Sequence, residues 1–368
     1  MKKFYTLLVV FLLVIGLVAC GGDTKKEPAG GGEKTGEAVE GSDVTVALLI
    51  GNLGDMSFND SANEGLLRAA NDFGVKPVVI EYGHDPNKYE PNLIDAAEMG
   101  YDVIMASATL QTAFENVADD YPDSTFILFD TEINWDAGDF SNVYCITYKA
   151  NEASFLGGYV SAAISKTGTI GFLGGVDQPI INDFLLGYIE GAQQFNPDIK
   201  VITTYAGSYS DPSKGKELTL GMVNQGADIS FNVAGGTGVG LIEAAAETNT
   251  MVLGVDSDQA LKYKEQGQEN LAEVIPTSVL KNVGDSLYRA IDLYVKGELP
   301  IGTTDNLGIN EGGVGLADNE YYQKMVPEDV RTAVKELEGK VTSGEITISS
   351  AIGKATDEIS AIRDAVKP

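Results

Sequence analysis

The apolar residues of the chain follow two different spacings from residue 44 onward. Short continuous apolar runs, such as Val44–Ile50 and Thr125–Phe129, are typical of strands buried on both faces of a parallel sheet. Between these runs, apolar residues recur three and four positions apart, as Ala62 and Leu66 do within Asn59–Phe73, and this spacing predicts helices. The alternation of the two patterns predicts an α/β fold built from doubly wound parallel sheets.

This alternation occurs twice along the chain. In the first series the predicted strands are Val44–Ile50, Val78–Tyr82, Val103–Ala106 and Thr125–Phe129, and the predicted helices are Asn59–Phe73, Pro91–Met99 and Gln111–Asp120. In the second series the predicted strands are Thr169–Leu173, Val201–Tyr205, Ile229–Val233 and Met251–Val255, and the predicted helices are Ile180–Phe195, Lys214–Asn224 and Gly240–Glu247. Each series has about 100 residues, which is enough to bury its own core, so the sequence predicts two similar lobes.

The remaining segments should connect the lobes. A predicted helix at Ala150–Ser165 leads to the second lobe, and a long helix at Val279–Lys296 should return to the first. We expect residues 306–348 to add a strand or two and the helix Glu328–Glu338, and Ala355–Val366 to form a tail helix. The expected first lobe is 44–149 plus about 278–302, the second is 150–277 plus about 303–348, and the tail is 349–368.

The first residues have the pattern of an export signal. Two lysines precede the apolar run Phe4–Ala19, which is short for a membrane-spanning helix. Leu17-Val18-Ala19-Cys20 resembles the bacterial lipobox, in which the cysteine is acylated, for example with palmitate, and becomes the new N-terminus. We therefore expect a lipoprotein signal peptide at residues 1–19, a lipidated Cys20, and a flexible glycine-rich tether at residues 20–43. Such an anchor would hold the protein on the extracytoplasmic face of the cell membrane.

The amino-acid composition argues against several classes of function. The chain has 25 Lys and Arg against 54 Asp and Glu, a formal charge of −29, so it should repel nucleic-acid backbones. One histidine and two cysteines make a histidine-based metal centre, a catalytic triad or a disulfide framework improbable, and we predict no metal or cofactor. Cys145 lies in an apolar run and is expected to be a buried strand residue.

Polar, aromatic and glycine residues follow the predicted strands. In open α/β sheets ligands bind beyond the carboxyl ends of the strands, so these residues are the candidate ligand-binding residues. The candidates of the first lobe are Asn52, Asp55, Phe58, Asn59, Ser107 and Asp130, and those of the second lobe are Tyr209, Gly235, Gly236 and Asp256. The last candidate, Lys281, lies in the segment expected to return to the first lobe. Lys281 falls at the start of the predicted return helix, and Ser57 or Asn59 could cap the first helix.

Each candidate type has a chemical use and a structural alternative. Aromatic rings can stack on a flat ligand, carboxylates can accept hydrogen bonds from ligand hydroxyls, and a lysine can donate to a ring acceptor. Alternatively, Phe58 is a hydrophobic staple, Asp130 caps a loop, the turn around Asp256 is a solvated or calcium-binding turn, and Lys281 is a solvated surface residue.

The strand ends together resemble the basic membrane protein family, also called the purine nucleoside receptor A-like family of ABC transporter lipoproteins. The matching stretches are GDMSFND (54–60), NEASFLGGY (151–159), GFLGGVDQPIINDFLLGYIEG (171–191), GSYSDPSKGKEL (207–218), NVAGGTGVG (232–240), GVDSDQ (254–259) and TSVLKNVGDSLY (277–288). The resemblance implies a type I periplasmic-binding-protein fold, in which two lobes joined by a multi-strand hinge close a cleft around a nucleoside, and ABC permease subunits as partners.

The family resemblance also implies roles for single residues. It implies that Phe58 and Tyr209 sandwich the base, that Asp130 and Asp256 hold the ribose and the base edge, and that Lys281 is the family lysine. The glycine turn at Gly235 and Gly236 would bring backbone close to the ligand. The chain departs from the family in two places: the loop after the first strand is short and offers Asn52 where the family has an Asp, and Tyr209 stands where Phe is common.

We therefore predict a substrate-binding protein of an ABC transporter that binds purine nucleosides such as inosine, guanosine and adenosine. It would be a monomer and not an enzyme. The alternatives are a sugar receptor of the same fold, an extracellular nucleoside-processing enzyme, and an adhesin or regulatory lipoprotein. The enzyme alternative is weakened because the chain lacks a DxDxxxDD calcium pattern.

Overall fold

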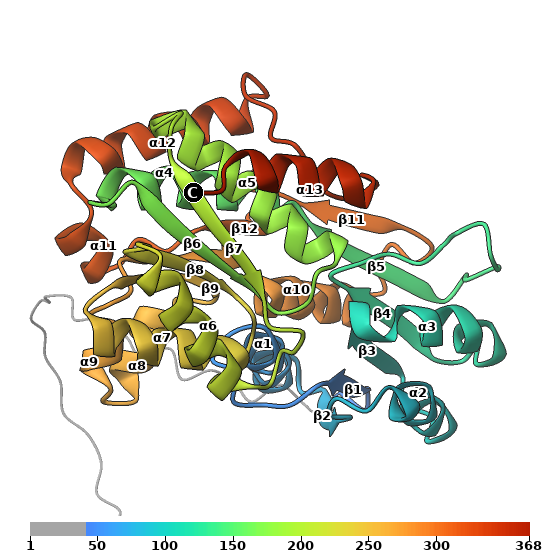
Figure 1. Ribbon diagram of the computed structural model, residues 1–368. Helices are drawn as coiled ribbons and strands as arrows, with labels where there is room; N and C mark the ends of the chain where they lie inside the picture. The colour runs from blue at the N-terminus through green and yellow to red at the C-terminus, as the bar shows by residue number, and fades with distance from the viewer. Residues whose placement is uncertain (1–41) are drawn as a thin grey trace, which may run out of the picture. The chain divides into compact units, whose positions relative to one another are not determined.

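The structure is a computed structural model that describes residues 42–368 (Figure 1). The predicted signal peptide at 1–19, the predicted lipidation site Cys20 and nearly all of the predicted tether lie outside the described residues. None of the helices within residues 42–368 combines the length and apolar character that crossing a bilayer requires.

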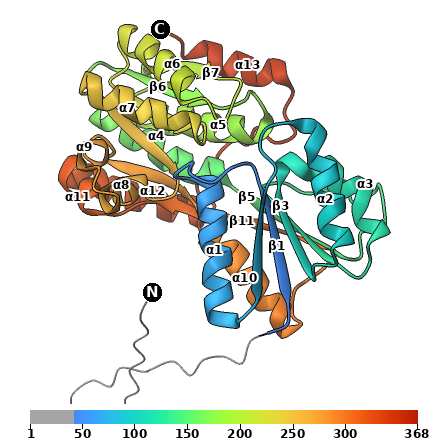
Figure 2. The ribbon, with the colours of Figure 1, turned by 90° about the horizontal axis from the view of Figure 1, so that it is seen from below.

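The first lobe is built on a parallel six-stranded sheet of order β11-β5-β4-β3-β1-β2. Its strands are β1 (Thr45–Ile50), β2 (Lys76–Glu81), β3 (Val103–Ser107), β4 (Thr125–Phe129), β5 (Val143–Tyr148) and β11 (Thr304–Leu307). Its main helices are α1 (Phe58–Phe73), α2 (Tyr89–Glu98), α3 (Gln111–Val117) and α10 (Val283–Lys296). Figure 2 shows α1 and α10 on one side of this sheet and α2 and α3 on the other, and each pair buries its own apolar cluster against the strands.

The second lobe repeats this plan with the order β12-β10-β9-β8-β6-β7, in which only β12 is antiparallel. Its strands are β6 (Thr169–Gly174), β7 (Lys200–Tyr205), β8 (Ile229–Val233), β9 (Met251–Asp256), β10 (Thr277–Lys281) and β12 (Val314–Leu316). Its helices are α4 (Ala150–Ile164), α5 (Pro179–Phe195), α6 (Pro212–Asn224), α7 (Thr237–Thr248), α8 (Gln259–Glu265), α9 (Glu269–Ala272), α11 (Glu320–Met325), α12 (Glu328–Thr342) and α13 (Thr356–Ala365). The α4 and α5 helices cover one face, and α6, α7 and α8 cover the other.

The predicted α/β fold of two doubly wound lobes is confirmed. In each sheet the first strand of the lobe lies between the second and the third, so the strand order reverses beside β1 and beside β6. Loops that leave the carboxyl ends of strands at such a reversal diverge to opposite faces, and the gap between them is where this fold binds ligands. The loops after β1 and β6 therefore flank the expected ligand-binding position.

The segment around Lys281 corrects the sequence prediction. Residues 277–281 form strand β10, which pairs with both β9 and β12, and the helix predicted over Val279–Lys296 begins only at Val283. The short apolar pair Val279-Leu280 in this segment suits a strand as well as a helix start, and pairing with the two neighbouring strands decides between them. Lys281 thus ends a strand of the second sheet.

The positions at which the chain passes from one lobe to the other also differ from the expected lobe boundaries. Residues 278–281 of strand β10 lie in the second sheet although they were expected in the first lobe, and Thr304–Leu307 pairs with β5 in the first sheet although it was expected in the second lobe. The difference arises because β10 and β11 take their places from pairing with distant strands. The strand β5 was absent from the predicted series, but Cys145 is buried within it as expected.

The tail packs on the second lobe. Helix α13 places Ile359 in an apolar cluster with Leu186 of α5, and the backbone N–H of Val201 donates to the carbonyl oxygen of Val366 at 2.8 Å. The tail is therefore part of the second lobe, packed on α5 and hydrogen-bonded to β7.

Candidate ligand-binding site

The loop after β1 is held by the carboxylate of Asp55. This buried carboxylate accepts hydrogen bonds from the backbone N–H groups of Ser57 at 3.0 Å and Asn59 at 2.8 Å, and from the Asn59 side-chain amide at 2.9 Å. These bonds satisfy N–H groups at the start of α1, which have no partner within the helix. The prediction that Ser57 or Asn59 caps α1 is wrong, because the carboxylate of Asp55, which precedes the helix, takes that role.

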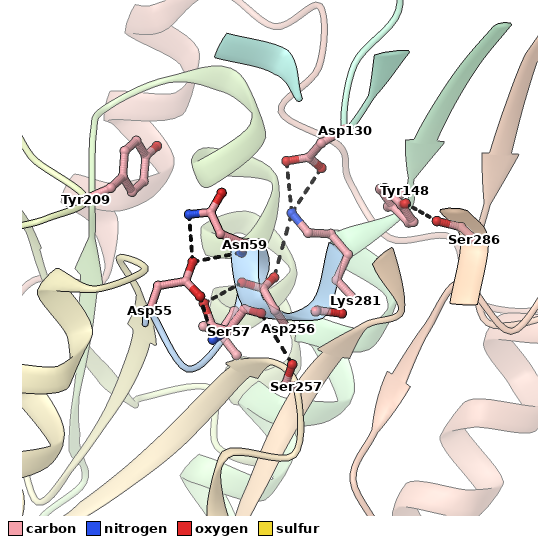
Figure 3. A network of polar contacts seen from close by, with 12 residues as sticks. Asp55, Ser57, Asn59, Asp130, Tyr148, Tyr209, Asp256, Ser257, Lys281 and Ser286 are labelled. Carbon is pink, nitrogen blue, oxygen red and sulfur yellow. Dashed lines mark hydrogen bonds and ion pairs between the residues drawn. The ribbon is translucent and has the colours of Figure 1, made fainter. Parts of the chain in front are cut away.

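Lys281 lies at the centre of a buried cluster of charges (Figure 3). Its Nζ atom lies 3.0 Å from both carboxylate oxygens of Asp130 and 3.7 Å from Asp256 Oδ1. Only 4% of the Lys281 side chain is exposed, which rules out the solvated-surface alternative. Asp130 follows β4 and Asp256 ends β9, so the lysine joins the ends of strands from both sheets.

The two carboxylates of this cluster lie on unusual backbone. Asp130 has φ 68° and Asp256 has φ 61°, a left-handed conformation that a residue with a Cβ atom rarely adopts. Strained positions of this kind persist where the surrounding structure holds them, and they concentrate at functional sites. Both side chains pair with Lys281, Asp130 directly after β4 and Asp256 as the last residue of β9.

Burial dominates the electrostatics of the cluster. It raises the pKa of Asp256 to about 6, with Lys281 opposing the rise and Asp130 and Asp55 adding to it. Burial also raises the pKa of Asp130 and of Asp55. For Lys281, burial acts to lower the pKa, but the two neighbouring carboxylates outweigh it and the pKa is raised, so the ammonium stays charged. One cation therefore serves several carboxylates that are costly to keep ionised.

One oxygen of the cluster has no hydrogen-bond donor among the described residues. Asp256 Oδ2 accepts from the hydroxyl of Ser57 at 3.1 Å, whereas the buried Oδ1 accepts from none. A buried carboxylate oxygen without a donor costs free energy that a hydroxyl or N–H of a bound ligand would offset.

Aromatic rings enclose the ammonium group. Its Nζ lies 4.7 Å from the ring centroid of Phe58, 5.1 Å from that of Phe184 and 5.9 Å from that of Tyr148, all distances at which a cation is attracted to a ring face. The sequence did not single out Phe184 or Tyr148. Phe184 lies on the apolar face of α5, where its spacing is that of an ordinary core residue. Tyr148 ends β5, beyond the apolar run around Cys145 that the sequence analysis considered.

The second lobe contributes Tyr209 and the glycine turn. The Tyr209 hydroxyl accepts a hydrogen bond from the side-chain amide of Gln178 at 2.7 Å. Burial raises the pKa of Tyr209, and the carboxylates of Asp130 and Asp256 raise it further. A Cβ atom added to Gly236 would lie 3.1 Å from the Tyr209 carbonyl oxygen and 3.9 Å from Asp55 Cβ, which places the turn between the two lobes.

Of the other predicted residues, Ser107 lies beside the Lys281 cluster and Asn52 lies away from it. Ser107, the buried last residue of β3, pairs in register with Phe129, directly before Asp130, so it lies beside the cluster. Asn52 is exposed and its amide lies 3.4 Å from the Glu81 carboxylate, so in this conformation it does not join the Lys281 cluster.

Contacts between the lobes enclose the site. The Gln259 side-chain amide donates to the carbonyl oxygen of Met56 at 3.3 Å, and Lys262 pairs with Glu64 at 2.6 Å across the lobes.

Within residues 42–368 no group of three acidic, histidine or cysteine side chains is arranged to hold a metal ion. A cavity of about 360 Å³ is lined by residues of 282–289 and 305–313, where the chain passes between the lobes, and not by the Lys281 cluster. Two of its lining residues, Arg289 and Asp305, form an ion pair at 2.8 Å.

Two doubly wound lobes whose strand ends meet around buried polar and aromatic side chains define a two-lobed solute-binding protein. The comparison with protein families agrees: residues 43–351 match the Bmp family, described as ABC transporter substrate-binding protein PnrA-like. The chain belongs to this family, which consists of binding proteins and not enzymes. Membership implies a small ligand and permease subunits as partners, and it confirms the predicted family and transporter class.

Known relatives resemble the chain over most of its length. The "ABC transporter nucleoside-binding protein BmpA" of Lactococcus lactis is 31% identical, covering 84% of this chain and 90% of its own length. "Basic membrane protein A" of Borreliella burgdorferi is 32% identical over 86% of this chain and 91% of its own. A crystal structure of ABC transporter solute-binding proteins from Aeropyrum pernix K1 superposes with a TM-score of 0.78 at 28% identity, covering 88% of this chain and 97% of that one. A periplasmic ribose ABC transporter structure from Conexibacter woesei, with a TM-score of 0.55 at 16% identity over 79% of this chain and 96% of its own, shares the fold alone.

Proposed function

We propose that this protein is a lipid-anchored receptor that binds purine nucleosides, of the inosine, guanosine and adenosine type, and delivers them to ABC permease subunits. It acts as a monomer on the extracytoplasmic face of the cell membrane, held there by acyl chains on Cys20. The name of the nucleoside-binding relative in Lactococcus lactis supports the ligand class.

The observation that carries the proposal is the unsatisfied Oδ1 of Asp256 beside the Lys281–Asp130 pair. A ribose hydroxyl is a neutral donor that can satisfy this oxygen without adding charge to the cluster. Phe58 and Tyr209 would hold the flat base by stacking, which contributes about 1–3 kcal/mol per base. A nucleotide fits less well, because its phosphate would face Asp55, Asp130 and Asp256 with Lys281 as the cation of the cluster.

Titration calorimetry with inosine, guanosine, adenosine, ribose and adenosine monophosphate tests the ligand class. We expect heat from at least one nucleoside, weaker binding of ribose, and weaker binding of the monophosphate. Replacing Asp256 with Ala should weaken nucleoside binding by more than about tenfold, whereas Asp120→Ala, at an exposed carboxylate, should leave it unchanged. Ribose binding as tight as nucleoside binding would favour a sugar receptor, and no heat from any nucleoside would reject the proposal.

Mass spectrometry of protein extracted from membranes tests the anchor. We expect a mature N-terminus at Cys20 carrying acyl chains, and release of the Cys20→Ser variant from the membrane fraction. An unmodified Cys20 in membrane-bound protein would reject this part of the proposal.

A further inference from the structure

Gln178 stands at a helix start without capping the helix. It is the residue that precedes α5, with extended backbone at φ −148° and ψ 161°, and its side chain accepts no hydrogen bond from the first turn. Residues at this position usually have short side chains that bond to the helix backbone. The Gln178 amide instead reaches out of the helix and donates to the Tyr209 hydroxyl at 2.7 Å.

The Tyr209 ring also lies against the backbone after β6. A Cβ atom added to Gly175 would lie 2.1 Å from Cε1 and 2.3 Å from Cδ1 of Tyr209, so the ring lies directly on a glycine that leaves room for it. The ring is therefore confined by backbone along its edge and by the Gln178 amide at its hydroxyl. Both constraints come from the turn that joins β6 to α5.

This turn is itself held rigidly. Pro179 sets the backbone of the first residue of α5, and the Asn182 side-chain amide, one turn later, donates to Asp177 at 2.8 Å. The same helix carries Phe184, whose ring centroid lies 5.1 Å from Lys281 Nζ. Gln178 therefore extends from a constrained turn at the start of the helix whose Phe184 ring contacts Lys281.

From these contacts we infer that Gln178 is a positioning residue for ligand binding: it fixes the Tyr209 ring at the orientation in which the ring stacks on a flat heteroaromatic ligand. The inference rests on the proposed function, and it assigns a use to the hydroxyl by which Tyr209 differs from a phenylalanine. Because the ring is oriented before the ligand arrives, binding does not have to immobilise it. Gln178 acts through Tyr209 and not by its own contact with the ligand.

A double-mutant cycle on nucleoside affinity tests this coupling. Gln178→Met keeps the length of the side chain and removes the hydrogen bond, and we expect it to weaken nucleoside binding about three- to tenfold. In the Tyr209→Phe background the same substitution should have no effect, since the hydroxyl it acts through is gone. An equal loss in both backgrounds would mean that Gln178 contacts the ligand directly or only supports the fold, and would overturn the inference.

Two further measurements extend the test, and the second of them does not depend on the proposed ligand. Gly175→Ala should weaken nucleoside binding, whereas Gly221→Ala, with open space around the added Cβ, should not. Nuclear magnetic resonance of ring-labelled tyrosine in the ligand-free full chain should show faster flipping of the Tyr209 ring in Gln178→Met than in the original chain. If nucleosides do not bind at all, the proposed function fails while the ring measurement still decides the inference, and unchanged ring flipping would overturn it.

Discussion

The Nζ atom of Lys281 lies 3.0 Å from each carboxylate oxygen of Asp130, although the two residues belong to different sheets. Lys281 ends β10 in the second lobe, and Asp130 follows β4 in the first. Both side chains are largely buried, with exposed fractions of 4% and 13%. Their ion pair therefore joins the two lobes within the candidate site.

Removing the lysine should leave buried carboxylates without a cation. We expect Lys281→Met to lower the free energy of unfolding by about 3 kcal/mol at pH 7.5 and to weaken nucleoside binding, because breaking a buried pair leaves an uncompensated charge. Chemical denaturation followed by circular dichroism measures the first effect. The double variant Lys281→Met with Asp130→Asn should recover part of the loss. Lys335→Met, at an exposed lysine of α12, is the control and should change neither quantity.

Neutralising Asp256 should stabilise the ligand-free protein while weakening its binding of ligand. The pKa of Asp256 is raised from 3.8 to about 6, so the folded state holds the proton more tightly than the unfolded chain. Stability therefore falls as pH rises from about 4 to about 6, and above this window the ionised side chain costs up to roughly 3 kcal/mol. Asp256→Asn should be more stable than the original chain at pH 7.5, and the difference should disappear as pH falls toward 4.

Thermal unfolding at a series of pH values between 4 and 8 measures this difference. Asp120→Asn, at an exposed carboxylate, should track the original chain at every pH. A variant Asp256→Asn that is less stable than the original chain at pH 7.5 would show that Lys281 and Ser57 more than compensate the buried charge.

Met56 should contribute to closure of the lobes. This residue of the first-lobe loop has φ 56° and joins the apolar cluster that α7 and α8 form on the second sheet. Met56→Ala removes that contact and should shift the ligand-free protein toward open forms, by about 2 kcal/mol or less, and weaken nucleoside binding. Small-angle scattering should report a larger radius of gyration. Met56→Leu, which keeps the apolar volume, should behave as the original chain, and an unchanged radius for Met56→Ala would contradict the prediction.

Glycines in helices should respond to substitution according to the space around them. Gly221 in α6 and Gly339 in α12 have open space where a Cβ would lie, so alanine at either should raise the free energy of unfolding by about 0.5–1 kcal/mol. In α5, a Cβ on Gly191 would lie 1.8 Å from the Phe155 carbonyl oxygen of α4, so Gly191→Ala should be destabilising. Melting temperatures of the three variants test both directions, and a stabilised Gly191→Ala would contradict the close packing of α4 on α5.

Most elements of the fold follow from local spacing. The strand Thr125–Phe129 has the same bounds in the sequence prediction and in the structure, and the helices around it agree to within a few residues. The apolar run and the helical repeat are properties of neighbouring residues, so they can be read without knowing what the segment packs on. Of β5 only the apolar run around Cys145 was expected to be a strand, and the start of α10 was placed too early. The bounds of these elements depend on β4, β11, β9 and β12, which pair with β5 or β10.

The candidate site was only partly visible in the sequence. Position after a strand identified Asp130, Asp256 and Tyr209, because strand ends of a parallel sheet face one edge. Lys281 was singled out too, but as the start of a helix, whereas it ends a strand between the two carboxylates. Asn52 was singled out by the same reasoning and lies exposed beside Glu81, since position alone does not specify the direction of a side chain in a loop.

The order of residues along the chain was therefore enough to specify two α/β lobes, the strand ends that bear functional groups, and the excess of negative charge. The partnership of Lys281 with Asp130, the enclosure of its ammonium by Phe184 and Tyr148, and the hydrogen bond from Gln178 to Tyr209 arise only when the chain has folded. Hydrophobic spacing acts over a few residues, whereas these contacts join segments from 31 to 151 positions apart. Which side chains meet across such separations depends on how the sheets and lobes pack, and that packing is a property of the whole chain.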